Sequence, residues 1–489
     1  MTLTNSRNTM KINFRTIAAM VIAAASLESA ALTLPDIINR NMVLQQNSEA
    51  SLWGWAKPKS KVAVTTGWNG KSYTATAGKD GRWDVKVATP AASYDVQNVT
   101  VTGDGTTVTL DNVLIGEVWF ASGQSNMEMP LRGFWVAPVE GANKAIAESG
   151  KYKHAIRFAT VPKAKALTPQ TTVGGPWVEC VPENAPEFSA VGYFFARELN
   201  NILDVPVGII NCSWGGSKVE GWLPAEILKT YSDVDLANAA DPDYQEYSKP
   251  MIMYNGMLYP LAGYTVRGFL WNQGESNVGA HADYPERFGT MVNHWRDLWG
   301  QGNLPIYCVE VPPHYYGDDN GTWGALLREA QHKAVKAIPN AGIVPTPDLV
   351  APGTSYQIHP GKKLEIGERL AYMAATRDYG VKGIEAEAPE FESVDFDGNS
   401  AVLHFSNASD GFMPDRNIPG FEVAGEDHVF YPAQADVLCS NGCNAIKVTS
   451  DKVKDIKSVR FGFKNWQPTY VYSMRELPLV PFRTDNWDN

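Results

Sequence analysis

One largely apolar run, Val113 to Ala121, limits most strongly how this chain can fold. A run of this length and composition suits a buried strand. After Gly123 the run breaks into a tight turn that carries one hydroxyl, Ser125. Residues Asn126 to Met129 can begin a helix whose free N–H groups point toward this serine, where they would stabilise charge on a bound ester oxygen. The turn therefore predicts a serine nucleophile, and the alternative is an ordinary strand-to-loop connection.

The nucleophile elbow of the α/β-hydrolase fold does not fit this turn, because that elbow needs Gly two residues after the serine and Met127 stands there. Beyond Ser125, helical and strand patterns alternate as far as Tyr379. This alternation predicts an α/β domain with a parallel, doubly wound sheet at residues 112–380. Helical spacing marks 191–202, 323–338 and 364–374, and apolar strand patterns mark 206–210, 266–271, 306–311 and 342–344. The long polar stretches 132–185 and 225–259 are interpreted as insertions that shape a substrate cleft.

Short alternating apolar runs separated by turn residues precede and follow this domain. They predict an N-terminal β-sandwich-like domain at residues 32–111 and a C-terminal β module at residues 388–489. Trp53, Trp55 and Trp68 are interpreted as core residues of the first domain, with stacking on sugars as the alternative.

The first 31 residues have the pattern of a secretory signal peptide, with Arg7, Lys11 and Arg15 ahead of the apolar stretch Ile17 to Ala25. The alternative is a short membrane anchor, although the stretch is shorter than the roughly 20 residues that a span needs. We therefore predict a periplasmic or secreted protein with no transmembrane segment in the mature chain. Its oligomeric state stays open.

The formal net charge of −11 argues against nucleic acid as a partner. Cys439 and Cys443 flank an obvious turn, and in an exported chain they form either a local disulfide or a pair of free thiols. Cysteines at this spacing without nearby His residues make a poor metal site.

The block VLIGEVWFASGQSNMEM, residues 113–129, resembles the signature of bacterial sialate O-acetylesterases within the SGNH hydrolase superfamily. The resemblance extends over nearly the whole mature chain. It implies an SGNH-hydrolase-like three-layer domain and a serine esterase that works through an acyl-enzyme intermediate without a cofactor. The terminal LPLVPFRTDNW resembles the family segment that closes over the hydrolase sheet, so the C-terminal module is expected to pack on that domain.

A serine hydroxyl needs a base within hydrogen-bond reach, and the pKa of His suits that role best. Among eight histidines, His359 stands out because Ile358-His359-Pro360 follows the last predicted strand of the sheet and precedes a helix. That position lies at the carboxyl edge of the sheet, where sites of α/β proteins form. A surface loop residue is the alternative from position alone. The resemblance implies that the His of this triplet is the base.

Two further turns at strand ends supply candidate oxyanion donors, residues 211–217 and 271–277. In the first, a Gly-Gly pair lets a backbone N–H approach a substrate carbonyl. The resemblance implies a glycine N–H from the first turn, assigned to Gly216, and a side-chain amide from the second, assigned to Gln273 with Asn272 as the alternative. A plain tight turn and a capped helix start are the alternatives from sequence alone. Supporting roles are expected for Gln124, Asn126, Gly215 and Glu275.

The residue that would orient His359 is the least defined, because Tyr356 and Gln357 stand where many relatives carry Asp. Asp348 matches an Asp-Leu pair of the family and is the candidate for a triad. The alternative is a Ser–His dyad in which Gln357 or a backbone carbonyl holds the ring, and we favour it because Asp348 lies eleven residues before His359. No metal-binding motif falls near the turn, so no metal is expected.

The leading functional hypothesis is the removal of O-acetyl groups from sialic acids. Deacetylation of xylan or another plant polysaccharide is the nearest alternative, and a non-catalytic glycan-binding protein is the alternative of another class. Sialic acid carries a carboxylate and needs a local cation. Arg132 and Lys218 are the candidates, with solvated surface charge as the alternative for each.

Overall fold

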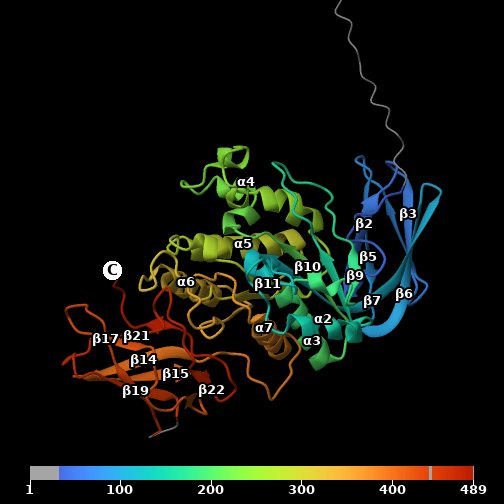
Figure 1. Ribbon diagram of the computed structural model, residues 1–489. Coiled ribbons are helices and arrows are strands. Elements are labelled where there is room, and N and C mark those ends of the chain that lie inside the picture. The colour runs from blue at the N-terminus through green and yellow to red at the C-terminus, as the bar shows by residue number, and fades with distance from the viewer. Residues whose placement is uncertain (1–31, 440–442, 488–489) are drawn as a thin grey trace, which may run out of the picture.

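The centre of the molecule is a sheet of parallel strands with helices on both faces (Figure 1). Its strand order is β13-β12-β11-β7-β10-β8, which confirms the predicted α/β class. The computed structural model describes residues 32–439 and 443–487, so the predicted signal peptide lies outside the described residues. The strands are β7 Thr106–Gly123, β8 Ile156–Thr160, β10 Val207–Ser213, β11 Gly268–Asn272, β12 Ile306–Val309 and β13 Ala341–Val344.

The long strand β7 connects the N-terminal domain with the hydrolase domain. Its first part pairs antiparallel with β6 (Ser93–Gly103), and its last part lies between β10 and β11. The predicted boundary between residues 111 and 112 therefore falls inside one strand. After β7 the chain forms β8 and then β10 on one side of that strand and later β11 on the other, so the winding reverses at β7. Such a reversal leaves a crevice at the carboxyl end of the strand, which is where Ser125 follows.

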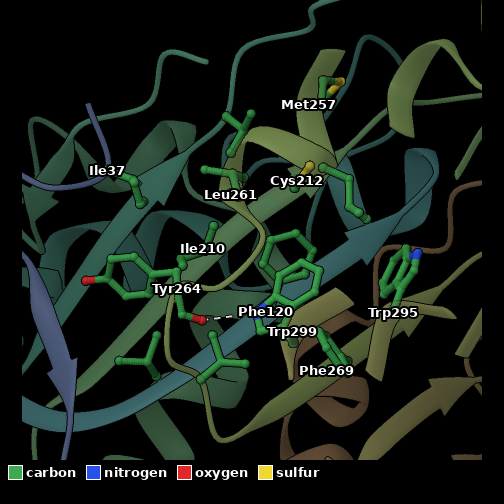
Figure 2. Close-up of a cluster of buried hydrophobic side chains, with 14 of the residues drawn as sticks. Ile37, Phe120, Ile210, Cys212, Met257, Leu261, Tyr264, Phe269, Trp295 and Trp299 are labelled. Atoms are coloured by element: carbon green, nitrogen blue, oxygen red, sulfur yellow. Dashed lines mark hydrogen bonds between the residues drawn. The ribbon is translucent and has the colours of Figure 1, made fainter. Parts of the chain in front are cut away.

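Side chains of β7 alternate between two cores, because successive residues of a strand point to opposite faces of a sheet. Val118 and Phe120 belong to the core that helices α5 (Tyr284–Trp299) and α6 (Trp323–Ala337) close. Trp119 and Ala121 belong to the core that helices α3 (Ala190–Leu203) and α7 (Lys363–Asp378) close. Figure 2 shows part of the first core, in which aromatic rings of α5 surround Phe120. Of these four helices, α3, α6 and α7 lie at predicted positions, whereas α5 was not predicted.

The N-terminal domain consists of antiparallel strands in addition to β1, which pairs parallel with β7. In β3 every second residue is buried, as expected for a strand with one face toward a core. Trp53 is fully buried, and Trp55 and Trp68 pack against the same core, which confirms their interpretation as core residues. The strands are β1 Val43–Gln45, β2 Glu49–Trp55, β3 Lys61–Thr66, β4 Ser72–Thr76 and β5 Arg82–Ala88.

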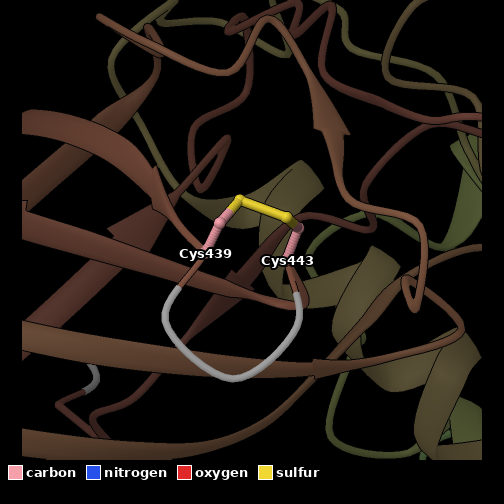
Figure 3. Close-up of a disulfide and its surroundings, with 2 residues drawn as sticks. All are labelled: Cys439 and Cys443. Carbon is pink, nitrogen blue, oxygen red and sulfur yellow. A yellow bond between two sulfur atoms is a disulfide. The ribbon is translucent and has the colours of Figure 1, made fainter.

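The C-terminal β module lies at the opposite end of the molecule from the N-terminal domain (Figure 1). It contacts helix α6 directly, where Arg483 binds Glu329 at 3.0 Å and Arg328 donates to the carbonyl of Lys464 at 2.5 Å. A disulfide joins Cys439 and Cys443 at the end of β19 (Figure 3). The strands are β14 Glu390–Asp397, β15 Ser400–Ser406, β16 Phe412–Met413, β17 Phe421–Ala424, β18 Tyr431–Pro432, β19 Gln434–Leu438, β20 Ala445–Thr449, β21 Ser458–Phe461, β22 Tyr472–Ser473 and β23 Phe482–Arg483.

The interpretation of residues 132–185 as an insertion is wrong in part. This segment contains helix α2 (Ala142–Glu148), but it also supplies β8 to the central sheet and β9 (Trp177–Glu179) to its edge. The signal was weak because β8 has only five residues and includes a buried Arg157, which pairs with Glu179 at 3.4 Å. The stretch 225–259 contains α4 (Ala225–Leu228) and several one-turn helices. Within the described ranges, no helix is long and apolar enough to cross a bilayer.

A buried histidine on α6, His332, links the hydrolase domain to the C-terminal module. Its Nε2 lies 2.8 Å from Oε2 of Glu310, and its Nδ1 lies 3.8 Å from Oε1 of Glu390 on β14. Burial alone would lower the pKa of His332, but the two carboxylates outweigh it and raise the pKa to about 9. A raised pKa means that the charged form stabilises the folded state.

We therefore expect thermal stability to depend on His332 in the alkaline range. Its contribution is complete below about pH 6.5, the ordinary pKa of His, and is lost as the pH rises through about 9. Calorimetry between those values should show Tm falling by several degrees in the wild type and by less in His332→Gln. Equal Tm profiles for the two proteins would contradict this role of His332.

Candidate active site

Ser125 lies directly beyond the carboxyl end of β7, at the point where the winding of the sheet reverses. The turn that exposes it needs Gly123, which has a φ of 135°. A Cβ at this position would lie 2.2 Å from the carbonyl oxygen of Asn272 on the neighbouring strand. The same carbonyl accepts a hydrogen bond from the Gln124 N–H at 2.9 Å. This close approach of two backbones fixes the direction in which the chain leaves β7.

Helix α1 (Ser125–Glu128) begins at the serine itself and comprises a single turn. The N–H groups of Met127 and Glu128 donate to the carbonyl of Gln124, each at 2.9 Å. The N–H of Ser125 has no hydrogen-bond partner among the described residues. It is therefore free to bind an oxygen of a substrate.

Gly215, from the turn after β10, lies against Ser125. A Cβ on Gly215 would lie 3.2 Å from Cβ of Ser125, so any larger residue would crowd the serine. The carboxylate of Glu128, which also pairs with Lys163 at 2.7 Å, accepts a hydrogen bond from the Gly215 N–H. Gly216 has a φ of 81°, and its N–H has no partner in the part of the chain that the structure describes. The structure thus brings the predicted glycine turn to the serine and leaves one N–H available.

The geometry of the turn after β11 does not support Gln273 as an oxyanion donor. Its Nε2 donates to the carbonyl of Ser217 at 3.1 Å and to Oδ1 of Asn277 at 2.7 Å, and its side chain is fully buried. Both amide hydrogens are therefore already used. The alternative residue, Asn272, ends β11 beside Gly123, and its buried Nδ2 has no hydrogen-bond partner within the described residues. A buried polar group without a partner is costly, so it points to a functional role. The candidate donor moves from Gln273 to Asn272.

Gln124 connects the serine turn with the turn after β11, as expected of a supporting residue. Its Oε1 accepts hydrogen bonds from the N–H groups of Gly274 at 3.2 Å and Ser276 at 3.3 Å. Gly274 has a φ of 153° and no room for a Cβ, which would lie 2.5 Å from Val311. The two turns therefore form one rigid unit.

Asn126 connects the serine turn with the turn after β11 and with the loop that carries His359. Its Nδ2 donates to Glu275 and to the carbonyl of Ile358 at 3.0 Å, and its Oδ1 accepts from Nζ of Lys363 at 2.6 Å. Lys363 is fully buried at the start of α7, and burial lowers its pKa to about 7, although the Glu275 carboxylate acts in the opposite direction. Burial likewise raises the pKa of Glu275. Asn126 thus holds the loop that carries His359 against the serine turn.

His359 is half-buried on that loop, with its ring edge-to-face against Phe134 at a centroid distance of 5.2 Å. Burial first, and then the positive charge of Lys363, lower the pKa of His359 to about 4. The imidazole is therefore neutral at physiological pH, as a general base must be. The Ser125 hydroxyl and the His359 ring are not hydrogen-bonded to each other, and such catalytic hydrogen bonds commonly tighten only when substrate binds.

Neither Asp348 nor the Gln357 side chain is hydrogen-bonded to the ring of His359. Both carboxylate oxygens of Asp348 are bound by Arg369, at 3.0 and 2.6 Å. Gln357 accepts from the backbone N–H of His359 at 3.1 Å and donates to the carbonyl of Val136 at 3.0 Å, so it fixes the loop and not the ring. The geometry therefore does not support Asp348 as a member of a triad.

Among the described residues, no group of three His, Cys, Asp or Glu side chains is placed to hold a metal ion. Residues 115–376, which include every turn described above, match the model of a family of carbohydrate esterases, the sialic acid-specific acetylesterases. The chain belongs to this family.

Relatives of known activity cover nearly the whole chain. Human sialate O-acetylesterase is 26% identical over 481 residues, which cover 91% of each chain. Mouse sialate O-acetylesterase is 24% identical and covers 95% of this chain and 97% of its own. The crystal structure of a carbohydrate acetylesterase from Xanthomonas citri has 34% identity and a TM-score of 0.82, over 94% of this chain and 100% of that one. The chain is a carboxylic ester hydrolase that acts on acetylated sugars.

Three residues of this esterase site were not found by sequence reasoning. The local sequence does not distinguish Glu128 and Lys363 from ordinary surface charges, because only the fold shows that Glu128 binds the Gly215 N–H and that Lys363 is buried. Phe134 lies in a stretch interpreted as an insertion, and nothing in its spacing indicates a contact with His359. A partial signal existed for Lys363, since it stands four residues after His359 at a helix start.

The pH dependence of the esterase should respond to Lys363. With His359 proposed as the base, we expect activity to fall when this residue becomes protonated, so the acidic limb of kcat/KM should lie well below the ordinary His pKa of about 6.5. Lys363→Met removes a neighbouring positive charge and should move this limb upward by roughly 0.5–1 pH unit. The position of this limb on the pH axis does not depend on the fraction of the protein that folds. Lys362→Met, one residue away, is the control and should keep the wild-type limb, and an unshifted limb in Lys363→Met would contradict the electrostatic argument.

Proposed function

We propose that this esterase removes O-acetyl groups from sialic acids through an acetyl-enzyme on Ser125. Two observations carry the proposal. A Cβ on Gly215 would lie 3.2 Å from Cβ of Ser125, and the unpartnered amide belongs to Asn272, which pairs with Gly123 two residues before the serine. We assign the oxyanion hole to the N–H groups of Ser125 and Gly216 together with this amide.

In the first half of the proposed reaction, His359 accepts the proton of the Ser125 hydroxyl while Oγ bonds to the acetyl carbon. The carbon–oxygen bond to the sugar then breaks, and the imidazolium returns the proton to the departing sugar oxygen. In the second half, His359 activates a water molecule in the same way, and acetate leaves Ser125. Negative charge develops twice on the same carbonyl oxygen, which the three donors stabilise. A dyad suffices for these steps, because each needs one base that takes up a proton and returns it.

The carboxylate of sialic acid needs a cation near the site, and Lys218 is our candidate. Arg132 is engaged by Glu187 at 2.6 Å, whereas Lys218 forms no ion pair with any described residue and stands two positions after Gly216. Acetylated xylan, the alternative substrate, carries no carboxylate on its xylose units and would not need this charge.

Acetate release from O-acetylated sialic acid and from acetylated xylo-oligosaccharides tests the proposal directly. We expect faster turnover of the sialic acid, and Lys218→Ala should raise KM for it by roughly tenfold, the effect of losing one charge-assisted contact. Arg132→Ala serves as the control, with a much smaller effect. Preference for the xylo-oligosaccharides, together with no effect of Lys218→Ala, would favour the plant polysaccharide instead.

We also propose that the protein is exported. The pattern of residues 1–31 and the disulfide between Cys439 and Cys443 support an oxidising compartment.

A further inference from the structure

A tight turn beside His359 holds a tryptophan almost entirely in solvent. Phe134 and Ala137 form a pair of backbone hydrogen bonds, at 3.0 and 3.1 Å, and the two residues between them make the turn. Trp135 is 93% exposed and Val136 is 79% exposed. Large apolar side chains that project this far from a surface commonly mark a binding site.

The conformation of this turn is strained. Val136 has a φ of 56°, a left-handed conformation that a β-branched residue rarely adopts. Such strain persists only where surrounding contacts impose it, and it occurs preferentially at functional sites. The contacts here come from the catalytic loop, because Gln357 donates to the carbonyl of Val136 at 3.0 Å and the ring of Phe134 packs on His359. The turn that presents Trp135 is thus fastened to the general base.

A second exposed aromatic residue lies next to Gln357, which donates the hydrogen bond to the carbonyl of Val136. Tyr356 precedes Gln357 and is 75% exposed. Tyr315, which is 46% exposed, lies on a neighbouring loop and donates its N–H to the carbonyl of Ser355 at 2.8 Å. Three exposed aromatic residues therefore emerge from loops that touch the His359 loop or belong to it. Rigid aromatic rings offer a large contact area at a low cost in conformational entropy.

We propose that Trp135 and Tyr356 form a stacking platform for the sugar next to the acetylated one, so that the enzyme recognises its substrate as part of an oligosaccharide. The inference deepens the proposed function and rests on it. The apolar C–H face of a pyranose stacks on an aromatic ring, whereas its hydroxyls stay in water. The acetylated sugar must lie at Ser125, so the next sugar along the chain passes over a loop that borders the site, and the loop held against His359 carries Trp135.

The test compares an oligosaccharide with a single sugar that bears the same acetyl ester. The substrates are 9-O-acetylated sialyllactose and free 9-O-acetylated sialic acid, and the measured quantity is the ratio of their kcat/KM values. Trp135→Ala should lower this ratio by roughly tenfold, mainly through a higher KM for the trisaccharide, as expected when a well-packed aromatic contact is lost. Tyr356→Ala should lower it by less, and Trp135→Phe should restore part of it.

The matched control is Phe396→Ala, which removes a 43% exposed ring on β14 of the C-terminal module. It should leave the ratio at the wild-type value. A wild-type ratio in Trp135→Ala would overturn the platform, even if both substrates are hydrolysed well.

Binding to a Ser125→Ala background separates this inference from the proposed function. Calorimetric titration of that protein with the acetylated trisaccharide should give a Kd that rises about tenfold when Trp135→Ala is added. Acetylated xylotriose and acetylated xylose form the second pair of probes. If the wild type hydrolyses neither sialic acid ester but the xylotriose pair shows the drop in ratio, the sugar assignment fails and the platform stands. If Trp135→Ala changes neither the kcat/KM ratio of any substrate pair nor the Kd from the titration, the platform is wrong.

Discussion

Ser125→Ala should lower kcat for an acetyl ester by at least about 10⁴-fold and leave Tm nearly unchanged. The loss is large because the remaining groups can bind the ester but have no atom to attack it, and knocking out the nucleophile of a serine hydrolase costs about as much as removing its whole catalytic apparatus. Stability changes little because the half-buried hydroxyl forms no hydrogen bond with any described residue. Chromogenic acetate hydrolysis and a thermal melt measure the two quantities.

Ser122→Ala is the matched control. Ser122 lies three residues earlier on β7, is fully buried, and has a hydroxyl without a partner in the described ranges. Its replacement should leave kcat close to the wild-type value. Activity of Ser125→Ala above a tenth of wild type would remove this serine from the mechanism.

Asn272→Ala should lower kcat by roughly 10²–10³ with little change in KM, because an oxyanion donor acts mainly on charge that develops in the transition state. Gln273→Ala should instead lower Tm, since this side chain bridges Ser217 and Asn277 and accepts a hydrogen bond from Tyr284 at 3.2 Å. Measuring kcat and Tm for both variants distinguishes a donor from a structural amide. A loss of kcat confined to Gln273→Ala, at unchanged Tm, would restore the original assignment.

The exchange of Asn272 for Gln273 shows where sequence reasoning stops. Both residues stand at the end of β11, and successive side chains of a strand point in opposite directions. Which of them faces the serine depends on where the strand ends, and boundaries are the least reliable part of a sequence-based prediction. The apolar pattern located the turn, whereas the neighbouring backbone at Gly123 decides its orientation.

The fold could be predicted from the sequence for a different reason, and Ser125 and His359 could be proposed on the same basis. The long apolar run before Ser125 and the βα alternation after it are strong local patterns, and they locate the nucleophile turn and the His359 loop at one edge of the sheet. The pairing of Asp348 with Arg369 could not be predicted from the sequence, because Arg369 lies 21 residues away on a helix. Arg369 binds both carboxylate oxygens of Asp348. The burial of Lys363 is likewise a property of the packed structure and not of the local sequence.

Covalent labelling tests the central assignment most directly. A serine-directed phosphonate should abolish esterase activity, add one inhibitor mass to the intact protein, and appear on the peptide that contains Ser125. His359→Ala should react far more slowly, because the serine then lacks its base. An adduct on any other residue, or complete hydrolytic activity in a protein labelled at Ser125, would contradict the assignment of Ser125 as the nucleophile.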